Sequence, residues 1–492
     1  MKSKSLLFVP ALAAAAAATT PTTPNPASFL PSSLTSIIQN LLPSIPGLTL
    51  TPQIATTFTQ PLAVDILRNT PITREGTTLR LGSLPWNASG ANVYWMGLDE
   101  NVIPPPGQPF YAPTNASYPT LGRITEVMNG LATLGARSVR GHTLGISVGN
   151  PLSVMPAPGV VNQQAFETID WAVYQARQHG IRIFAPLVDN YDYYHGGKFV
   201  WLRWAGFNLT GDDSTNPEVM QFYTNQTIVD AFKGYIHTLL THTNQYTGLT
   251  YAEDPTIFAY ETGNELGGPV FGDMWVPVEW TTQIADYIKE LAPNKLVIDG
   301  TYGVNTTHLA IPSLDIFSDH YYPPNMTKLA DDIALVQGAG KTYIAGEYDW
   351  TGNNPAAAPL PEFFSALQAS AQAGGPVVGD MFWSLFMHDV PDCNIFVNHT
   401  DGETLQYGNP LNTVQNNTQI SLIREHLFSM RGETVGPYLP AVACPGYKPP
   451  PTTQNPTQAM DSPTPSPPPS PPPQDEAQPP PPPAQQHVVS GG

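Results

Sequence analysis

Eight short apolar runs with strand character recur along the middle of the chain, and they constrain its fold more than any other feature. Segments with helical spacing of apolar residues lie between most of them, for example residues 163–179 and 280–291. Alternating strands and helices predict a parallel sheet with crossover connections. Eight such strands favour an α/β fold of the closed (β/α)8 TIM barrel type over an open doubly wound sheet. The expected strands are residues 92–97, 138–141, 181–188, 256–261, 295–299, 315–320, 342–347 and 376–385.

The two ends of the chain differ in composition from the middle. Proline accounts for 55 of the 492 residues, and the excess lies at the ends. Residues 448–492 are so rich in proline that little apolar surface remains to be buried, so we expect a disordered tail there. Residues 19–47 are rich in Thr, Pro and Ser. The globular domain is expected at 48–447, with a short hairpin at about residues 77–84 and the barrel at about 92–431.

The first residues, 1–18, have the layout of a cleavable secretory signal peptide. Lys2 and Lys4 precede an apolar run that ends in small residues. This run is too short to span a bilayer. Eight Asn-x-Ser/Thr sites agree with passage through a glycosylating pathway. They begin at Asn87, Asn115, Asn208, Asn225, Asn305, Asn325, Asn398 and Asn416. We therefore expect a secreted, extracellular glycoprotein.

The two cysteines, Cys393 and Cys444, both lie late in the globular part of the chain. In an exported protein, an even number of cysteines is most simply explained by pairing. We therefore expect one disulfide bond between them. It would tie the end of the folded domain back onto the segment that follows the last barrel strand.

The charge balance limits the class of partner. The formal net charge is −19, from 20 basic and 39 acidic residues. Such a balance argues against nucleic acid or an anionic membrane surface as a partner, but neutral polymers remain open. An apolar C-terminal stretch that would signal a lipid anchor is absent from the sequence. We expect a monomer without a membrane partner.

Polar and aromatic residues gather at the ends of the expected strands, where a barrel of this type carries its reactive groups. Each of them alone has a structural explanation, as an ion-pair, packing or core residue. Their joint placement at five of eight strand ends instead indicates a site that processes sugars. The residues are Arg140, Asn264, Glu265, His320, Tyr322, Glu347 and Trp383.

Cleavage of a glycosidic bond needs one carboxylic acid to protonate the departing oxygen and one carboxylate to attack the sugar or activate water. Glu265 and Glu347 are the candidate pair. Arg140 and the hydroxyl of Tyr322 are suitable donors to keep a nucleophilic carboxylate ionised. Asn264 is placed to hydrogen-bond the sugar hydroxyl next to the reacting carbon, a contact that strengthens in the transition state.

Three neighbouring features fit the same hypothesis. Trp383 offers an apolar face for a sugar ring. Glu261, four residues before Glu265, is interpreted as a support of the barrel interior. The long, aromatic segment 190–217 follows the third expected strand, so in a barrel it would cap the catalytic face.

Two competing constellations are weaker. Ser147 lies in a Gly-x-Ser-x-Gly match, but Asn150 and Pro151 follow it, whereas a nucleophile elbow leads directly into a helix. Four residues of the segment after the third strand could contact a cation, but they lack a dense oxygen-ligand loop. These are Asp192, His195, Asp212 and Asp213. We expect no metal, and a phosphate-binding Gly loop is absent from the sequence.

The run 254–265, Asp-Pro-Thr-Ile-Phe-Ala-Tyr-Glu-Thr-Gly-Asn-Glu, resembles the fourth-strand motif of glycoside hydrolase family 5, of clan A, and especially its fungal endo-β-1,4-mannanases. The resemblance covers about residues 92–427. Further stretches in the family's order are 136–140, 179–190, 246–251, 320–322 and 346–347.

The resemblance implies that 48–447 is a glycoside hydrolase catalytic domain, with Glu265 as acid/base and Glu347 as nucleophile. It also implies net retention of configuration, no cofactor and a polysaccharide substrate such as mannan. The residues that match the substrate-binding and supporting positions are Arg140, Asn190, Asn264, His320, Tyr322 and Trp383.

The chain departs from the family pattern directly after the candidate acid/base. The family usually has Pro there, whereas Leu266, Gly267 and Gly268 follow Glu265 in this chain. The departure affects the prediction of the substrate more than the prediction of the chemistry. Our first hypothesis is cleavage of β-1,4-mannosidic bonds. A β-glucanase or an exo-acting β-mannosidase would use the same two glutamates, and a non-catalytic glycan-binding cell-wall protein is the alternative from another class.

Overall fold

The computed structural model describes residues 65–100, 116–268, 275–390, 393, 395–399 and 401–442. These residues belong to one unit of the chain. The expected signal peptide, the segment 19–47 and the proline-rich tail lie outside the described residues. Cys444 also lies outside them, so its pairing with Cys393 stays a prediction.

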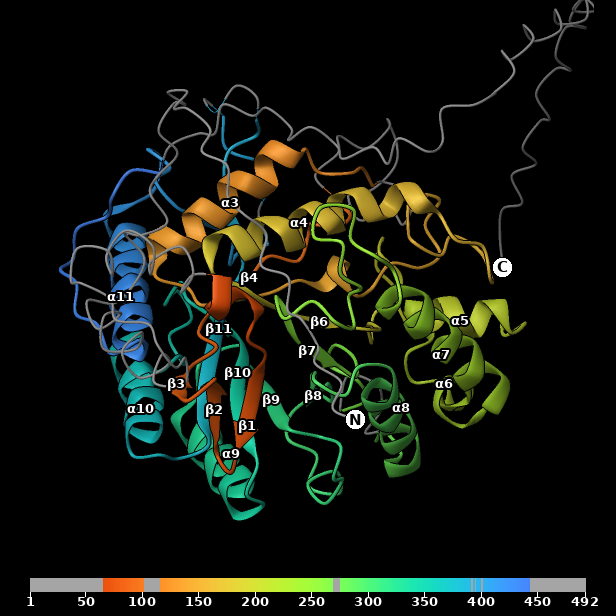
Figure 1. The fold of residues 1–492 in the computed structure, drawn as a ribbon. Helices are drawn as coiled ribbons and strands as arrows, with labels where there is room; N and C mark the ends of the chain where they lie inside the picture. Colours follow the sequence, from red (N-terminus) through yellow and green to blue (C-terminus); the bar gives the residue numbers. More distant parts are fainter. Residues whose placement is uncertain are drawn as a thin grey trace, which may run out of the picture. The chain divides into compact units, whose positions relative to one another are not determined.

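Eight parallel strands form a closed barrel, in the order β10-β11-β4-β5-β6-β7-β8-β9. In Figure 1 the strands lie at the centre and the helices surround them. The expected (β/α)8 barrel is therefore confirmed. The strands are β4 (Gly90–Asn92), β5 (Ser138–Arg140), β6 (Arg182–Pro186), β7 (Ile257–Glu261), β8 (Leu296–Asp299), β9 (Ile316–Tyr321), β10 (Thr342–Asp349) and β11 (Val377–Trp383).

Seven of the expected strands coincide with observed strands, and the first does not. β4 ends at Asn92, the residue at which we expected the strand to begin. The apolar run after it is buried, with Val93 and Met96 at 0 % exposure, although it is not a strand. A buried loop segment and a buried strand both read as apolar runs, so the pattern alone placed this strand too late.

The helices follow the strands around the barrel, and their ends carry recognisable caps. The side chain of Thr120 accepts a hydrogen bond from the backbone of Arg123 at the start of α3. Gly180, with φ of 69°, ends α4 in the left-handed conformation that favours glycine. The helices are α3 (Leu121–Leu134), α4 (Phe166–His179), α5 (Lys198–Trp204), α6 (Gln221–Thr224), α7 (Gln226–Leu240), α8 (Val278–Leu291), α9 (Met326–Gly338), α10 (Leu360–Gln372) and α11 (Val414–Met430).

A small antiparallel sheet covers the end of the barrel where the strands begin. The hairpin expected near residues 77–84 is part of this sheet, which has the order β1 (Ile72–Glu75), β2 (Thr78–Leu81) and β3 (Leu84–Trp86). Ile72, Leu79 and Trp86 are buried in one cluster with apolar residues of the barrel interior. The ring of Trp86 packs edge-on against Phe258 of β7, at 5.1 Å between centroids. The opposite end of the barrel, where the strands finish, is left for the site.

Several glycosylation sites can be assessed from their exposure. Asn208, Asn325 and Asn398 are exposed, as an acceptor must be. Asn305 is only 3 % exposed, and its amide contacts the ring of His308. Asn305 is therefore a buried structural residue. In the part of the chain that the structure describes, no helix combines the length and apolar character needed to cross a membrane.

The contact between Gly300 and Gly263 gives a test of the fold. A Cβ atom at Gly300, directly after β8, would lie 2.0 Å from the carbonyl oxygen of Gly263. We expect Gly300→Ala to lower the free energy of unfolding by about 1–3 kcal/mol, because the backbone has to shift. A Cβ atom at Gly234, inside α7, would meet no atom within 4 Å beyond the backbone of its own helix, so Gly234→Ala should be neutral or stabilising by about 0.5–1 kcal/mol. Urea denaturation of both variants checks this, and equal stability of the two would contradict it.

Candidate active site

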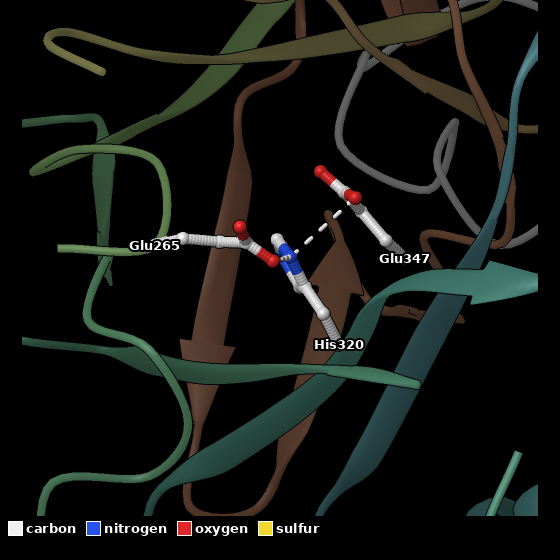
Figure 2. Close-up of side chains that lie close together, drawn as sticks. All are labelled: Glu265, His320 and Glu347. Carbon is white, nitrogen blue, oxygen red and sulfur yellow. Dashed lines mark hydrogen bonds and ion pairs between the residues drawn. The ribbon is translucent and has the colours of Figure 1, made fainter. Parts of the chain in front are cut away.

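Two glutamates face each other at the end of the barrel where the strands finish, with one histidine between them (Figure 2). Glu347 belongs to β10 and His320 to β9, whereas Glu265 lies in the loop after β7. His320 Nδ1 is 2.6 Å from Glu265 Oε1 and 3.5 Å from Glu347 Oε2. One oxygen of each glutamate and one ring nitrogen all lie within 4.8 Å of one another. The two carboxyl groups therefore share one small space.

Arg140, the last residue of β5, holds the carboxylate of Glu347 in place by an ion pair. Its side chain is fully buried, and Nη1 donates to Glu347 Oε1 at 2.5 Å. Nε donates to Glu261 Oε2 at 2.8 Å, so Glu261 has the supporting position that we expected. Nη2 donates to Asn264 Oδ1 at 2.8 Å. One cation thus fixes both the carboxylate of Glu347 and the residue before Glu265.

Glu347 is held in its ionised form. Burial alone would raise the pKa of its carboxyl, but the positive charge of His320, a hydrogen bond from His142 and the charge of Arg140 outweigh burial. The pKa of Glu347 consequently lies well below its usual range. The hydroxyl of Tyr322 donates to its other oxygen at 2.8 Å. The carboxylate is therefore available as a nucleophile or as a charge stabiliser.

Glu265 has a different environment and an unusual backbone. Its φ of 52° lies in the left-handed region, which residues with a side chain rarely adopt. Its Oε1 accepts from His320, and its Oε2 accepts from the hydroxyl of Tyr191 at 2.7 Å. Its side chain is 14 % exposed, compared with 7 % for Glu347. Such a strained residue at the mouth of a barrel is typical of a functional site.

His320 carries a raised pKa because of the two glutamates. Burial works against the charged ring, but the charge of Glu347, then the charge of Glu265 and its hydrogen bond, outweigh burial. His142 behaves oppositely, since burial and the charge of Arg140 lower its pKa. The site therefore combines one imidazole biased toward the charged form with one biased toward the neutral form.

Trp383 provides the aromatic surface of the site. Its ring stacks on Tyr94, with 5.0 Å between centroids and planes 3° apart. Its Nε1 donates to Asp401 Oδ2 at 2.8 Å, and its ring lies edge-on to His142. The side chain is partly exposed, so it is fixed in place and still reachable from solvent.

A model of glycoside hydrolase family 5, described as β-mannosidase-like, matches residues 115–331. Putative mannan endo-1,4-beta-mannosidase 9 of Oryza sativa subsp. japonica is 27% identical over 376 residues, which cover 66% of this chain and 83% of the relative. Mannan endo-1,4-beta-mannosidase 7 of Arabidopsis thaliana is 25% identical over 400 residues, which cover 71% of this chain and 85% of the relative. The chain is a glycosidase that resembles glycoside hydrolase family 5.

A solved structure has the same fold as this glycosidase. The endo-1,4-beta-mannanase from Rhizomucor miehei aligns with a TM-score of 0.55 at 21% identity, and the alignment covers 74% of this chain and all of that one, 100%. The likeness supports the barrel. The family-model match and the plant relatives confirm the resemblance that we inferred from the strand motifs, and with it the class of enzyme.

In this glycosidase the predicted strand-end residues come together in space. Arg140, Asn264 and Glu347 are joined by hydrogen bonds. His320 and Tyr322 contact the two glutamates, as described above. The structure therefore groups the candidates; their roles in catalysis remain predictions.

Asn190 occupies a supporting position in the structure. Its side chain is 0 % exposed, and its Oδ1 accepts from Lys198 Nζ at 2.5 Å. The amide also exchanges two hydrogen bonds of 3.3 Å with the backbone of Gly267. These bonds brace the loop that follows Glu265. Both the oxygen and the nitrogen of the amide therefore already have partners within the protein. The expected contact of Asn190 with a sugar stays a prediction.

Three of the four residues of the competing cation constellation have other partners among the described residues. Asp192 binds Arg203, with oxygen–nitrogen distances of 2.7 and 2.9 Å, and Asp213 caps its own turn. His195 Nε2 donates to Asp189 Oδ2 at 2.9 Å. The ligating atoms of Glu265, His320 and Glu347 are close enough for a cation, but the guanidinium of Arg140 beside them opposes a second positive charge.

Three site residues were missed by the sequence reasoning. His142 lies two residues after Arg140, so the strand-end rule could have found it. Asn92 was placed at the start of a strand that it actually ends, and its Nδ2 donates to the carbonyl of Gly346, next to Glu347. Tyr191 lies in the segment that we expected to cap the site, but no pattern in the sequence shows where a loop side chain points.

The coupling between His320 and Glu347 gives a test that needs no substrate. Glu347 contributes the largest of the effects that raise the pKa of His320. Glu347→Gln should therefore lower the pKa of His320 toward its ordinary value, measured by NMR titration of the imidazole. His308 is a matched control, because its pKa is raised through Asp299 at a separate place. If the pKa of His320 is unchanged, or if both histidines change alike, the described ion pairing is wrong.

Proposed function

We propose that this enzyme is a secreted, retaining family 5 hydrolase of β-1,4-mannosidic bonds in mannan-type polysaccharides. The substrate class is supported by relatives that are named mannan endo-1,4-beta-mannosidases and that align over most of their length. The mechanism is supported by the paired carboxyls and their unequal environments. Glu347 is the nucleophile, Glu265 is the acid/base, and no cofactor or metal takes part.

In the first step Glu347 attacks the anomeric carbon and forms a glycosyl-enzyme. Arg140, Tyr322 and the neighbouring histidines stabilise the carboxylate that this attack requires. The spacing of the carboxyls is the observation that carries the retaining mechanism. Inverting enzymes separate these groups by about 6.5–9.5 Å to admit water, whereas retaining enzymes hold them at about 5–5.5 Å. Oxygens of Glu265 and Glu347 within 4.8 Å of each other favour retention.

Glu265 acts on the departing and the incoming oxygen. As an acid it protonates the glycosidic oxygen during the first step, and as a base it takes a proton from the water that hydrolyses the glycosyl-enzyme. Its greater exposure, compared with Glu347, agrees with access to an oxygen outside the reacting sugar. Asn264, held by Arg140 and Asp189, is placed beside Glu265 for contact with a sugar hydroxyl.

Trp383 is proposed to carry the apolar face of the sugar ring at the reacting position. Because Tyr94 and Asp401 fix its indole, little side-chain entropy is lost when a ring stacks on it. His320, bonded to Glu265, and Asn190, which braces the loop after Glu265, support the acid/base. These residues complete the proposed substrate site.

An exo-acting β-mannosidase is a second candidate, because the matching family model is described as β-mannosidase-like. It would use the same two glutamates and release single mannose units. For the rest of the chain we propose a cleaved signal at 1–18, a catalytic domain at 48–447, a disulfide bond between Cys393 and Cys444, and a monomeric extracellular enzyme without nucleic-acid or membrane partners.

The substrate proposal is tested by a product profile on β-mannan, glucomannan, cellulose and β-1,3-glucan. We expect hydrolysis of β-mannan and glucomannan, with manno-oligosaccharides of several lengths in the early products and a rapid fall in viscosity. Mannose as the sole early product would favour the exo-acting β-mannosidase. Hydrolysis of cellulose or β-1,3-glucan without hydrolysis of mannan would overturn the substrate proposal.

The proposed roles are tested by two alanine variants measured on mannan and on aryl β-mannosides. Glu347→Ala should lose turnover on every substrate, because the covalent step has no substitute. Glu265→Ala should lose about 10²–10⁴-fold on mannan, but much less on a substrate whose leaving group needs no proton. Azide should restore part of its rate by attacking the glycosyl-enzyme.

Glu167 is a suitable control for these variants, because it is an exposed glutamate on α4. Glu167→Ala should retain wild-type rates on every substrate. Equal losses in the two active-site variants regardless of the leaving group, or near-normal rates in Glu347→Ala, would show that the roles are assigned wrongly.

A further inference from the structure

The loop after β6 is joined closely to the loop that carries Glu265. Backbone hydrogen bonds run from Asn264 N to Val188 O at 2.8 Å and from Asn190 N to Asn264 O at 3.1 Å. Asp189 Oδ1 accepts from Asn264 Nδ2 at 3.1 Å and from the backbone of Tyr191 at 3.2 Å. One carboxylate therefore fixes both Tyr191 and the residue before Glu265.

Two further contacts limit the freedom of this pair of loops. Lys198 binds the side chain of Asn190, which in turn binds the backbone of Gly267. A Cβ atom at Gly197 would lie 2.0 Å from the carbonyl oxygen of Tyr191, so glycine is needed for this close approach. The contacts with Asp189 and Gly197 thus fix the position of the Tyr191 backbone relative to Glu265.

The hydroxyl of Tyr191 reaches Glu265 Oε2 at 2.7 Å, while His320 occupies Oε1. Burial, followed by the charge of Glu265, raises the pKa of Tyr191 far above its ordinary value. The hydroxyl therefore keeps its proton and acts as a donor. A donor stabilises the ionised carboxyl more than the protonated one.

From this geometry we propose that Tyr191 is a positioning residue that orients the carboxyl of Glu265 and favours its ionised form. The inference rests on the proposed function, in which Glu265 must hold a proton in the first step and lack it in the second. Tyr191 therefore limits activity at high pH, where the acid form is lost, and it holds the carboxyl of Glu265 in one orientation for the second step.

Other groups face Glu265 or Tyr191 from several elements, and Tyr191→Phe leaves the chemistry of their side chains unaltered. They are His320 and Tyr322 at the end of β9, Glu347 of β10, Tyr302 after β8, and Asp189 and Tyr193 after β6. Tyr193 is the matched control, because no described residue accepts a hydrogen bond from its hydroxyl and its ring is 47% exposed.

The test compares the pH dependence of kcat/KM for the wild type, Tyr191→Phe and Tyr193→Phe. It uses whichever polysaccharide of the product profile the wild type hydrolyses. The profile of kcat/KM reports the ionisation of the free enzyme. Loss of the Tyr191 donor should shift the high-pH limb upward by about one pH unit, equivalent to about tenfold, since hydrogen bonds to charged groups are of this strength. Tyr193→Phe should leave that limb in place.

A second measurement follows Glu265 without turnover. Carboxyl ¹³C NMR, with Glu265→Gln to assign the signal, should show that Glu265 in Tyr191→Phe ionises at higher pH than in the wild type. The inference is overturned if the high-pH limb and the NMR titration are the same in the wild type and Tyr191→Phe, or if both Tyr→Phe variants shift equally. Failure to hydrolyse mannan would overturn the substrate proposal alone, because the comparison does not depend on which glycan is cut.

Discussion

The buried guanidinium of Arg140 is the interaction on which the site depends. It lies on β5 and is bonded to Asn92 of β4, Glu261 of β7 and Glu347 of β10, so it links strands around the barrel. An unpaired charge at 0 % exposure would be very costly, and the two carboxylates offset this cost. Burial opposes the charged form of Arg140, but Glu261 and Glu347 together raise its pKa above the ordinary value. The same contacts that allow a cation inside the barrel also hold Glu347 ionised and orient Asn264.

Two residues of the same type acquire different properties from what surrounds them. Glu347 is enclosed by an arginine, a tyrosine hydroxyl and two histidines, and its pKa is lowered despite burial. Glu265 projects from a loop with a left-handed backbone and has one donor on each oxygen. A stable anion on a rigid strand suits attack at carbon. A more exposed carboxyl on a braced loop suits exchange of a proton with the glycosidic oxygen and with water, which enter and leave the site.

The sequence predicted the barrel and most of the site for one physical reason. Parallel strands end at the same side of a barrel, so residues at strand ends converge even when they are far apart in the chain. Arg140, Glu265 and Glu347 follow this rule. The rule failed at β4, because the buried segment after Asn92 is as apolar as a strand. The contacts of loop residues such as Tyr191 and Asn190 could not be predicted from the sequence, because hydrogen-bond partners in loops follow from tertiary packing.

The left-handed backbone of Glu265 has a consequence for how this enzyme can change. A residue with a side chain in that region costs of order 1–3 kcal/mol, and the surrounding loop contacts maintain it. Glycine at this position would relieve the backbone cost, but it would also remove the acceptor of the hydrogen bonds from His320 and Tyr191. A screen for thermostable variants that selects glycine for its backbone would therefore lose the carboxyl. Position 265 is a place where stability and activity oppose each other, and a screen for thermostable variants should hold it constant.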